Sequence, residues 1–223
     1  MDNNPGSNVS STTKGARWLL KFLQPFIPVG AKQQFKVPQP SAFTWLAHIA
    51  HEAAGVWAAA ILLQQPSSTT QFAFGCSMAI LLLAGVFLIW SHWFSDLDPA
   101  VEHAVYAVGN LLLNTGLCSV LPAILTGVPG FVLTLPIFFM LVLNGKVSYS
   151  TGLGRALLSL SLVAVPLSSQ LSPMLKAGYV LNGIVPPIIY PLGRKHEILS
   201  PDGMHGFIEV VQCALSLMMA YGA

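Results

Sequence analysis

Seven apolar segments, separated by short polar links, fill the chain from residue 43 onward and constrain its fold more than any other feature. They lie at 43–64, 71–93, 100–126, 129–144, 155–171, 173–192 and 204–222. A transmembrane helix needs about 20 apolar residues, with a range of about 17–25. Only 8% of the residues are charged, against about 25% in soluble domains. The sequence therefore predicts an all-α, polytopic membrane protein surrounded by membrane lipids.

The basic residues indicate how these helices are oriented. If the N-terminus is inside, nine of the ten Lys and Arg residues fall on the inner side, and only Lys176 falls outside. This distribution follows the positive-inside rule. An even number of spans would separate Lys146 and Arg155 from Arg194 and Lys195. We therefore predict seven transmembrane helices, with the N-terminus inside and the C-terminus outside.

The region before the first apolar segment has a different character. Residues 16–27 place Arg17 and Lys21 one helical turn apart and apolar side chains around them, a pattern typical of an interfacial amphipathic helix. We divide the chain into three parts. They are a disordered tail with this interfacial segment (1–40), a first membrane unit of three helices (41–126) and a second unit of about four helices (127–223).

Ionisable residues inside the apolar segments gather toward the predicted inner side. Charged and imidazole groups at membrane depth are costly, and they mark functional sites or paired groups. The pattern His-x-x-x-Glu occurs twice, at His48–Glu52 and at His205–Glu209, and one helical turn joins each pair. The candidate binding residues are His48, His51, Glu52, His92, Glu102, His103, His205 and Glu209.

Four interpretations of these residues stay open. The pairs can be structural hydrogen bonds, or their imidazoles can ligate a pigment or a haem, with Gly55 and Gly206 giving a macrocycle room to approach. A carboxylate–histidine metal site is a third interpretation, although di-metal bundles use Glu-x-x-His instead, so the spacing alone assigns no metal ligand. A proton pathway is the fourth.

Other polar and proline positions give weaker signals. Asn182 is expected to form an interhelical hydrogen bond, and Pro186-Pro187 is expected to interrupt any regular helix over 173–192. Soluble-enzyme motifs such as G-x-G-x-x-G, the P-loop, G-x-S-x-G and H-E-x-x-H are missing from the sequence. Whether the protein is an enzyme is therefore not decided by motifs.

Short motifs in the chain resemble two plastid and cyanobacterial families of uncharacterised membrane proteins. The first part is similar to a small family that some algal plastid genomes encode as an open reading frame. The last segment of the chain is similar to the Leu-His-Gly-x-x-Glu signature of the second family, a plastid and cyanobacterial domain of unknown function. The motifs are Thr44-Trp45 with His48 and Glu52, His92-Trp93-Phe94, Val108-Gly109-Asn110, and Met204-His205-Gly206-Phe207-Ile208-Glu209. The resemblance covers the first three spans and the last one, whereas 127–200 matches only in hydropathy.

The resemblance implies a chloroplast thylakoid membrane and no known reaction. We therefore expect a non-catalytic subunit or assembly factor of a photosynthetic membrane complex, with other subunits of that complex as partners. Chlorophyll or carotenoid, before haem, is the cofactor expected at the candidate residues. The alternatives are a redox or metal-dependent membrane enzyme that uses the inner His/Glu residues, and a small-solute or ion carrier. The formal charge of +2 is too small to suggest a nucleic-acid partner.

Overall fold

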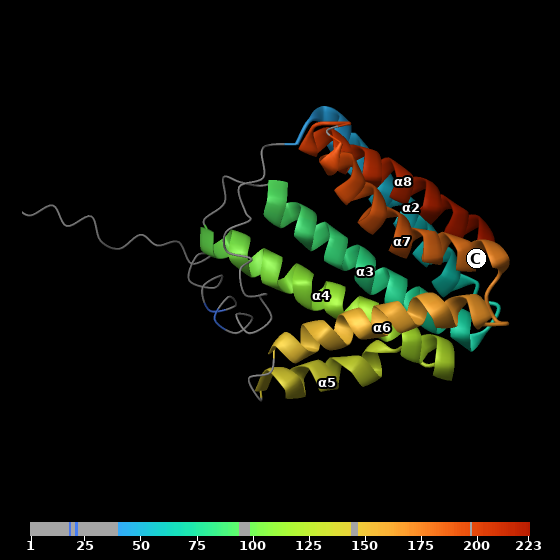
Figure 1. Cartoon of the computed structure of the whole chain (residues 1–223). Helices are drawn as coiled ribbons and strands as arrows, with labels where there is room; N and C mark the ends of the chain where they lie inside the picture. Colours follow the sequence, from blue (N-terminus) through green and yellow to red (C-terminus); the bar gives the residue numbers. More distant parts are fainter. Residues whose placement is uncertain (1–17, 19–20, 22–39, 94–98, 144–146, 197) are drawn as a thin grey trace, which may run out of the picture.

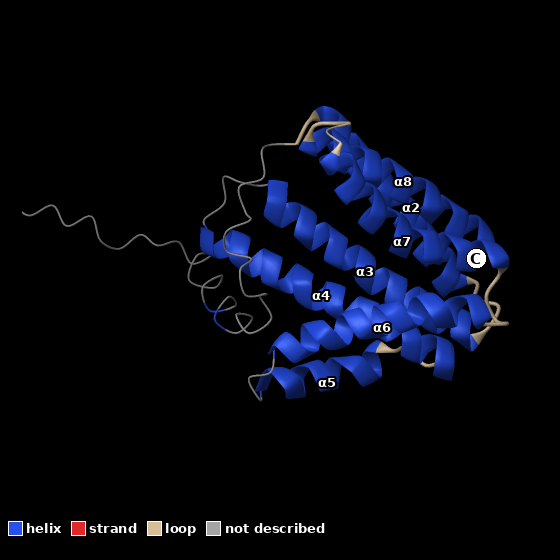
Figure 2. Ribbon diagram, in the orientation of Figure 1, coloured by secondary structure: helices blue, strands red, loops and turns tan. Residues whose placement is uncertain are grey.

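Seven helices make up the regular structure of the described residues from 40 onward. The structure, a computed structural model, describes residues 18, 21, 40–93, 99–143, 147–196 and 198–223. Within these ranges all regular elements are helical (Figure 2). The helices are α2 (Ala42–Gln64), α3 (Thr69–Trp93), α4 (Pro99–Thr126), α5 (Phe131–Leu143), α6 (Val147–Leu167), α7 (Pro173–Lys195) and α8 (Pro201–Gly222). Each overlaps one predicted apolar segment, so the all-α prediction is confirmed.

Three helices of the described chain are long and apolar enough to cross a membrane. They are Ala42–Gln64, the Thr69–Phe87 part of α3, and Asp202–Gly222. Their outward faces are apolar too: Leu46 on α2 is 68% exposed. A helix that is hydrophobic all round belongs in a protein core or in a membrane. The described fold thus suggests a membrane protein with at least these three helices as candidate spans. By contrast α5, with 13 residues, is only about 20 Å long at about 1.5 Å per residue.

Six of the helices form a closed ring, with the seventh outside it. Around the ring α2 packs on α3, α3 on α4, α4 on α6, α6 on α7, α7 on α8, and α8 on α2. Helix α5 lies outside, against α4 and α6 (Figure 1). The first and last helices of the ring are therefore neighbours, although almost the whole sequence separates them.

Helices α2 and α8 run parallel to each other and begin side by side at the same end of the bundle. Ser41 caps α2 by accepting a hydrogen bond from the Thr44 amide, and Ser200 caps α8 in the same way. The Ser41 amide donates to Asp202 Oδ1 at 3.2 Å, and the Thr44 hydroxyl donates to the Asp202 carbonyl at 3.1 Å. These contacts, which we call the N-terminal clasp, fix the register of the two helices.

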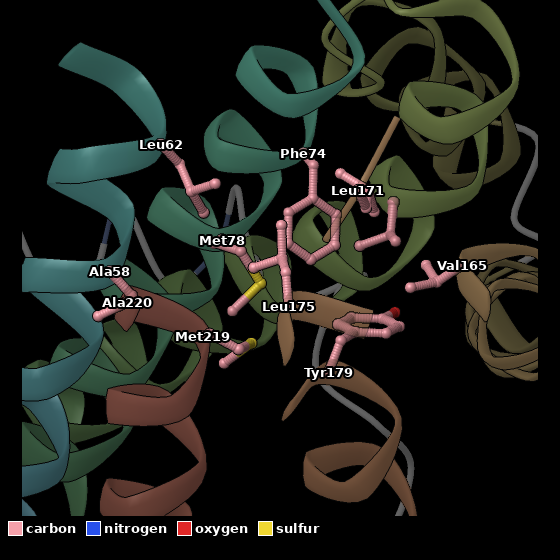
Figure 3. Close-up of a cluster of buried hydrophobic side chains, with 11 residues drawn as sticks. Ala58, Leu62, Phe74, Met78, Val165, Leu171, Leu175, Tyr179, Met219 and Ala220 are labelled. Carbon is pink, nitrogen blue, oxygen red and sulfur yellow. The ribbon is translucent and has the colours of Figure 1, made fainter. Parts of the chain in front are cut away.

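The hydrophobic core lies toward the other end of the ring. Phe74 from α3 stacks edge-on against Tyr179 from α7, with ring centroids 5.4 Å apart. Late residues of α2 and α8 and early residues of α7 surround this pair (Figure 3). The Tyr179 hydroxyl lies 2.6 Å from the Ser161 hydroxyl on α6, which satisfies both groups in the core. Packing therefore closes the end of the ring opposite the N-terminal clasp.

Two expectations about local structure have different outcomes. The expected interruption at Pro186-Pro187 is wrong, because α7 continues through both prolines and through Pro191. Prolines are tolerated in apolar helices when neighbouring helices satisfy the freed backbone groups, and α7 packs between α6 and α8. The predicted amphipathic helix at 16–27 falls outside the described residues, except for Trp18 and Lys21, which are helical.

Gly130 is expected to be essential for the contact between α4 and α5. A Cβ atom at this position would overlap the backbone carbonyl of Ser119 in α4. Gly130→Ala should therefore lower the free energy of unfolding by about 1–3 kcal/mol, the typical cost of overpacking, as measured by thermal unfolding in detergent. Gly203→Ala is the control, because the nearest atom, Ser200 Oγ, would be 3.2 Å away. Equal stability of the two variants would contradict the described packing of α5.

Candidate functional site

The candidate site lies where the first turns of α2 and α8 face each other. Thr44, His48 and His51 are spaced i, i+4 and i+7 along α2, so they form one stripe on that helix. His205 and Glu209 are one turn apart on α8. Because the N-terminal clasp holds the two helices parallel and in register, the two stripes meet.

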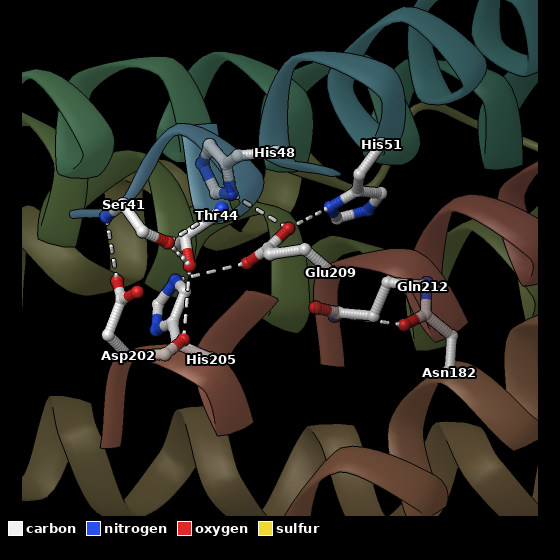
Figure 4. A network of polar contacts seen from close by, with 9 residues as sticks. All are labelled: Ser41, Thr44, His48, His51, Asn182, Asp202, His205, Glu209 and Gln212. Carbon is white, nitrogen blue, oxygen red and sulfur yellow. Dashed lines mark hydrogen bonds and ion pairs between the residues drawn. The ribbon is translucent and has the colours of Figure 1, made fainter. Parts of the chain in front are cut away.

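Three imidazoles converge on one carboxylate at this meeting point (Figure 4). His48 Nδ1 and His51 Nδ1 each lie 2.7 Å from Glu209 Oε2. His205 Nε2 lies 3.3 Å from Glu209 Oε1. We call these four residues the His/Glu cluster. The Glu209 side chain is only 8% exposed, whereas that of His205 is 49% exposed. The cluster therefore has a buried anionic centre and one open side.

The distances within the cluster suit a metal ion as well as hydrogen bonds. Two ligands that each lie about 2.0–2.1 Å from an ion are about 2.9–3.4 Å apart at octahedral or tetrahedral angles. One ligand atom each from His48, His205 and Glu209 lies within 4.8 Å of the others. His51 Nδ1 and the same carboxylate form a hydrogen bond of 2.7 Å, in which the carboxylate accepts. The chemistry of this donor set, imidazole with carboxylate, fits Zn²⁺ and Fe²⁺.

The two predicted pairs differ in what the structure shows. His205–Glu209 is confirmed as an i, i+4 contact. The predicted His48–Glu52 pair stays a prediction, because the contact that the structure gives His48 is with Glu209 on the neighbouring helix. Glu52 extends toward α3 instead, where a methyl group on Gly85 would overlap its Oε1 atom. Spacing along one helix reveals partners in that helix only, and here packing between helices provides the shorter contact.

The remaining predicted residues are not placed relative to the cluster. His92 lies in α3, and Glu102 and His103 lie in α4, but their side chains fall outside the described part of the structure. Their role stays a prediction. Sequence reasoning missed Gln212, whose Nε2 donates to Asn182 Oδ1 at 3.1 Å. Gln212 follows Glu209 by three residues and so lies on the same face of α8, which is the signal that could have found it. The expected interhelical role of Asn182 is confirmed.

A pigment or haem does not fit inside the described ring. The cavity at its centre has a volume of about 250 Å³, below the range of about 300–1,000 Å³ of pockets for drug-sized ligands. A macrocycle would have to lie on the outer surface, where His205 is the most exposed imidazole of the cluster. The buried imidazoles His48 and His51 both face Glu209. The central cavity is therefore too small to enclose a chlorophyll, carotenoid or haem, and the predicted cofactor site stays a prediction.

Comparison of the chain with protein-family models, with curated proteins and with solved structures finds no significant match. The resemblance to plastid and cyanobacterial families, with the photosynthetic role that it implies, thus stays a prediction. The contacts of the His/Glu cluster are the evidence from which a function can be argued.

Proposed function

We propose that this protein is a metal-dependent membrane enzyme whose centre is a divalent transition-metal ion bound by His48, His205 and Glu209. The observation that carries the proposal is the convergence of three imidazoles on the buried Glu209 carboxylate. An isolated carboxylate at membrane depth is costly. A metal cation that is bound by the carboxylate together with neutral imidazoles would offset this cost.

The number of ligands distinguishes a catalytic site from a structural one. Catalytic zinc sites have three protein ligands and keep one position for water or substrate, whereas structural sites are closed by four. Three residues of the cluster each bring one ligand atom within 4.8 Å of the other two, and the partly exposed His205 lies on the open side. A zinc ion in such a site lowers the pKa of its bound water and makes it a nucleophile at neutral pH.

His51 is a positioning residue in this proposal. It contacts Glu209 Oε2 at 2.7 Å and so holds the carboxylate in the orientation that the ion requires. Groups that hydrogen-bond to a metal ligand commonly contribute about 10–100-fold to metal affinity. We therefore expect His51→Ala to weaken Zn²⁺ binding within that range without abolishing it.

The proposal includes the predicted membrane topology. The N-terminus would lie inside, which the distribution of the basic residues supports, and α5, with 13 residues, would enter the bilayer without crossing its full thickness. The His/Glu cluster would then lie close to the inner face, because it occupies the first turns of α2 and α8. The substrate would reach it from that side.

Metal content of the purified full-length chain tests the proposal. The protein is stripped with a chelator in mild detergent, reloaded with Zn²⁺, washed, and analysed for bound metal. We expect one ion per chain, with at least tenfold weaker retention after His48→Ala or His205→Ala. Lower pH should release the ion, since protons compete for the imidazoles. His196→Ala is the matched control, because His196 is exposed near the end of α7. Absence of bound metal, or equal loss in all three variants, would refute the proposal.

A further inference from the structure

A second polar feature lies deeper in the bundle than the His/Glu cluster. The cavity of about 250 Å³ at the centre of the ring has walls from six helices, α2, α3, α4, α6, α7 and α8. Leucine side chains from α3, α4 and α6 form much of its surface. Its polar lining includes Glu52, Asn182, Gln212 and Ser216. Neither Glu209 nor any Lys or Arg is among the described residues that line it.

Glu52 differs from Glu209 in having one carboxylate oxygen without a hydrogen-bond partner among the described residues. Its Oε2 atom is buried and has no hydrogen-bond partner among the described residues. The nearby imidazoles do not supply one, since His48 and His51 direct their Nδ1 atoms toward Glu209. A buried polar atom without a partner costs about 1–3 kcal/mol, and more when it is charged. Glu52 therefore brings to the wall of the cavity a carboxyl group, one oxygen of which is buried and has no hydrogen-bond partner among the described residues.

We propose that this cavity binds a small organic cation that has an apolar body and one ammonium group. The ammonium group pairs with the Glu52 carboxylate, and the leucine-rich walls enclose the apolar body. Charge-assisted hydrogen bonds of this kind are roughly twice as strong as neutral ones. The volume equals that of about eight water molecules at about 30 Å³ each, which limits the ligand to a single ring with a short side chain.

The proposal does not depend on the metal site. The His/Glu cluster and the cavity share no metal ligand, because only His51, the positioning residue, belongs to both. Binding can therefore be measured on chelator-treated protein, and failure of one proposal leaves the other intact.

Two probes with the same ring, one with a cationic group and one with a neutral hydroxyl, test the proposal on the full chain in detergent at neutral pH. Benzylammonium and benzyl alcohol have the same size and ring, and their affinities are measured by calorimetric titration. We expect benzylammonium to bind at least tenfold more tightly than benzyl alcohol. Glu52→Gln should lower the affinity for benzylammonium at least tenfold and leave that for benzyl alcohol within about twofold, because charge-assisted pairing is removed.

A second variant locates the bound probe. Ser216 lines the cavity and is 2% exposed, so Ser216→Leu should fill part of the space and weaken both probes. Thermal unfolding shows whether each variant is folded. If Glu52→Gln does not fold, the comparison of the two probes on the unchanged chain and on Ser216→Leu decides. Equal affinities for the two probes, no binding of either, or a benzylammonium affinity that neither variant lowers would overturn the proposal.

Discussion

Glu209→Gln is expected to lower the affinity of the protein for Zn²⁺ by at least a hundredfold, which corresponds to about 2.8 kcal/mol. Glu209 is the only member of the His/Glu cluster that contacts all three imidazoles. Glutamine keeps the shape of the side chain and removes its charge, and a neutral amide is a poor ligand for zinc. A competition titration with a chromophoric chelator measures the change.

Glu52→Gln is the matched control for this experiment. It removes a carboxylate of the same type that lies in the same part of the bundle, yet Glu52 is not among the three residues whose ligand atoms converge. We expect the Zn²⁺ affinity of this variant to stay within about threefold of the wild-type value, because Glu52 does not ligate the ion in the proposed site. If Glu52→Gln and Glu209→Gln weakened Zn²⁺ binding equally, the loss would come from the lower negative charge of the region and not from ligation by Glu209.

Phe74→Ala is expected to lower the free energy of unfolding by about 3–5 kcal/mol, the range for deleting a large buried aromatic side chain. Phe74 is fully buried and stacks on Tyr179, so its loss leaves a cavity between α3 and α7. Chemical unfolding in detergent, followed by circular dichroism, measures the change.

Phe72→Ala provides the comparison within the same helix. Phe72 is 40% exposed, so its removal should cost less than half as much as that of Phe74. Equal losses would mean that the core at this end of the ring is not packed as described. A near-wild-type Phe74→Ala variant would lead to the same conclusion.

Hydropathy and segment length predicted the number, order and approximate position of the helices. This succeeded because each helix coincides with most of an apolar run, and short links separate the runs. The start of α6 was less well predicted: the helix begins at Val147, whereas the apolar pattern begins at residue 155. Five of the eight residues from 147 to 154 are Ser, Thr or Gly, so hydropathy alone does not include this stretch in the helix. The continuous α7 shows likewise that packing can override prolines.

The residues of the candidate site were predicted more accurately than their partners. His48, His51, His205 and Glu209 all stood out because imidazole and carboxylate groups are rare in apolar segments. Their arrangement depends on the contact between α2 and α8, which joins residues about 160 positions apart and which no local spacing reveals. The same applies to the cavity, because it exists only when all six helices close the ring.

X-ray absorption at the zinc edge tests the metal site most directly. On the Zn²⁺-loaded chain, the account predicts a ligand shell that contains two imidazole nitrogens and a carboxylate oxygen, at about 2.0–2.2 Å. The imidazole signal should fall to one nitrogen in both His48→Ala and His205→Ala and stay unchanged in His196→Ala. A shell of oxygen atoms alone, or an imidazole signal that survives both cluster substitutions, would contradict a metal centre at Glu209.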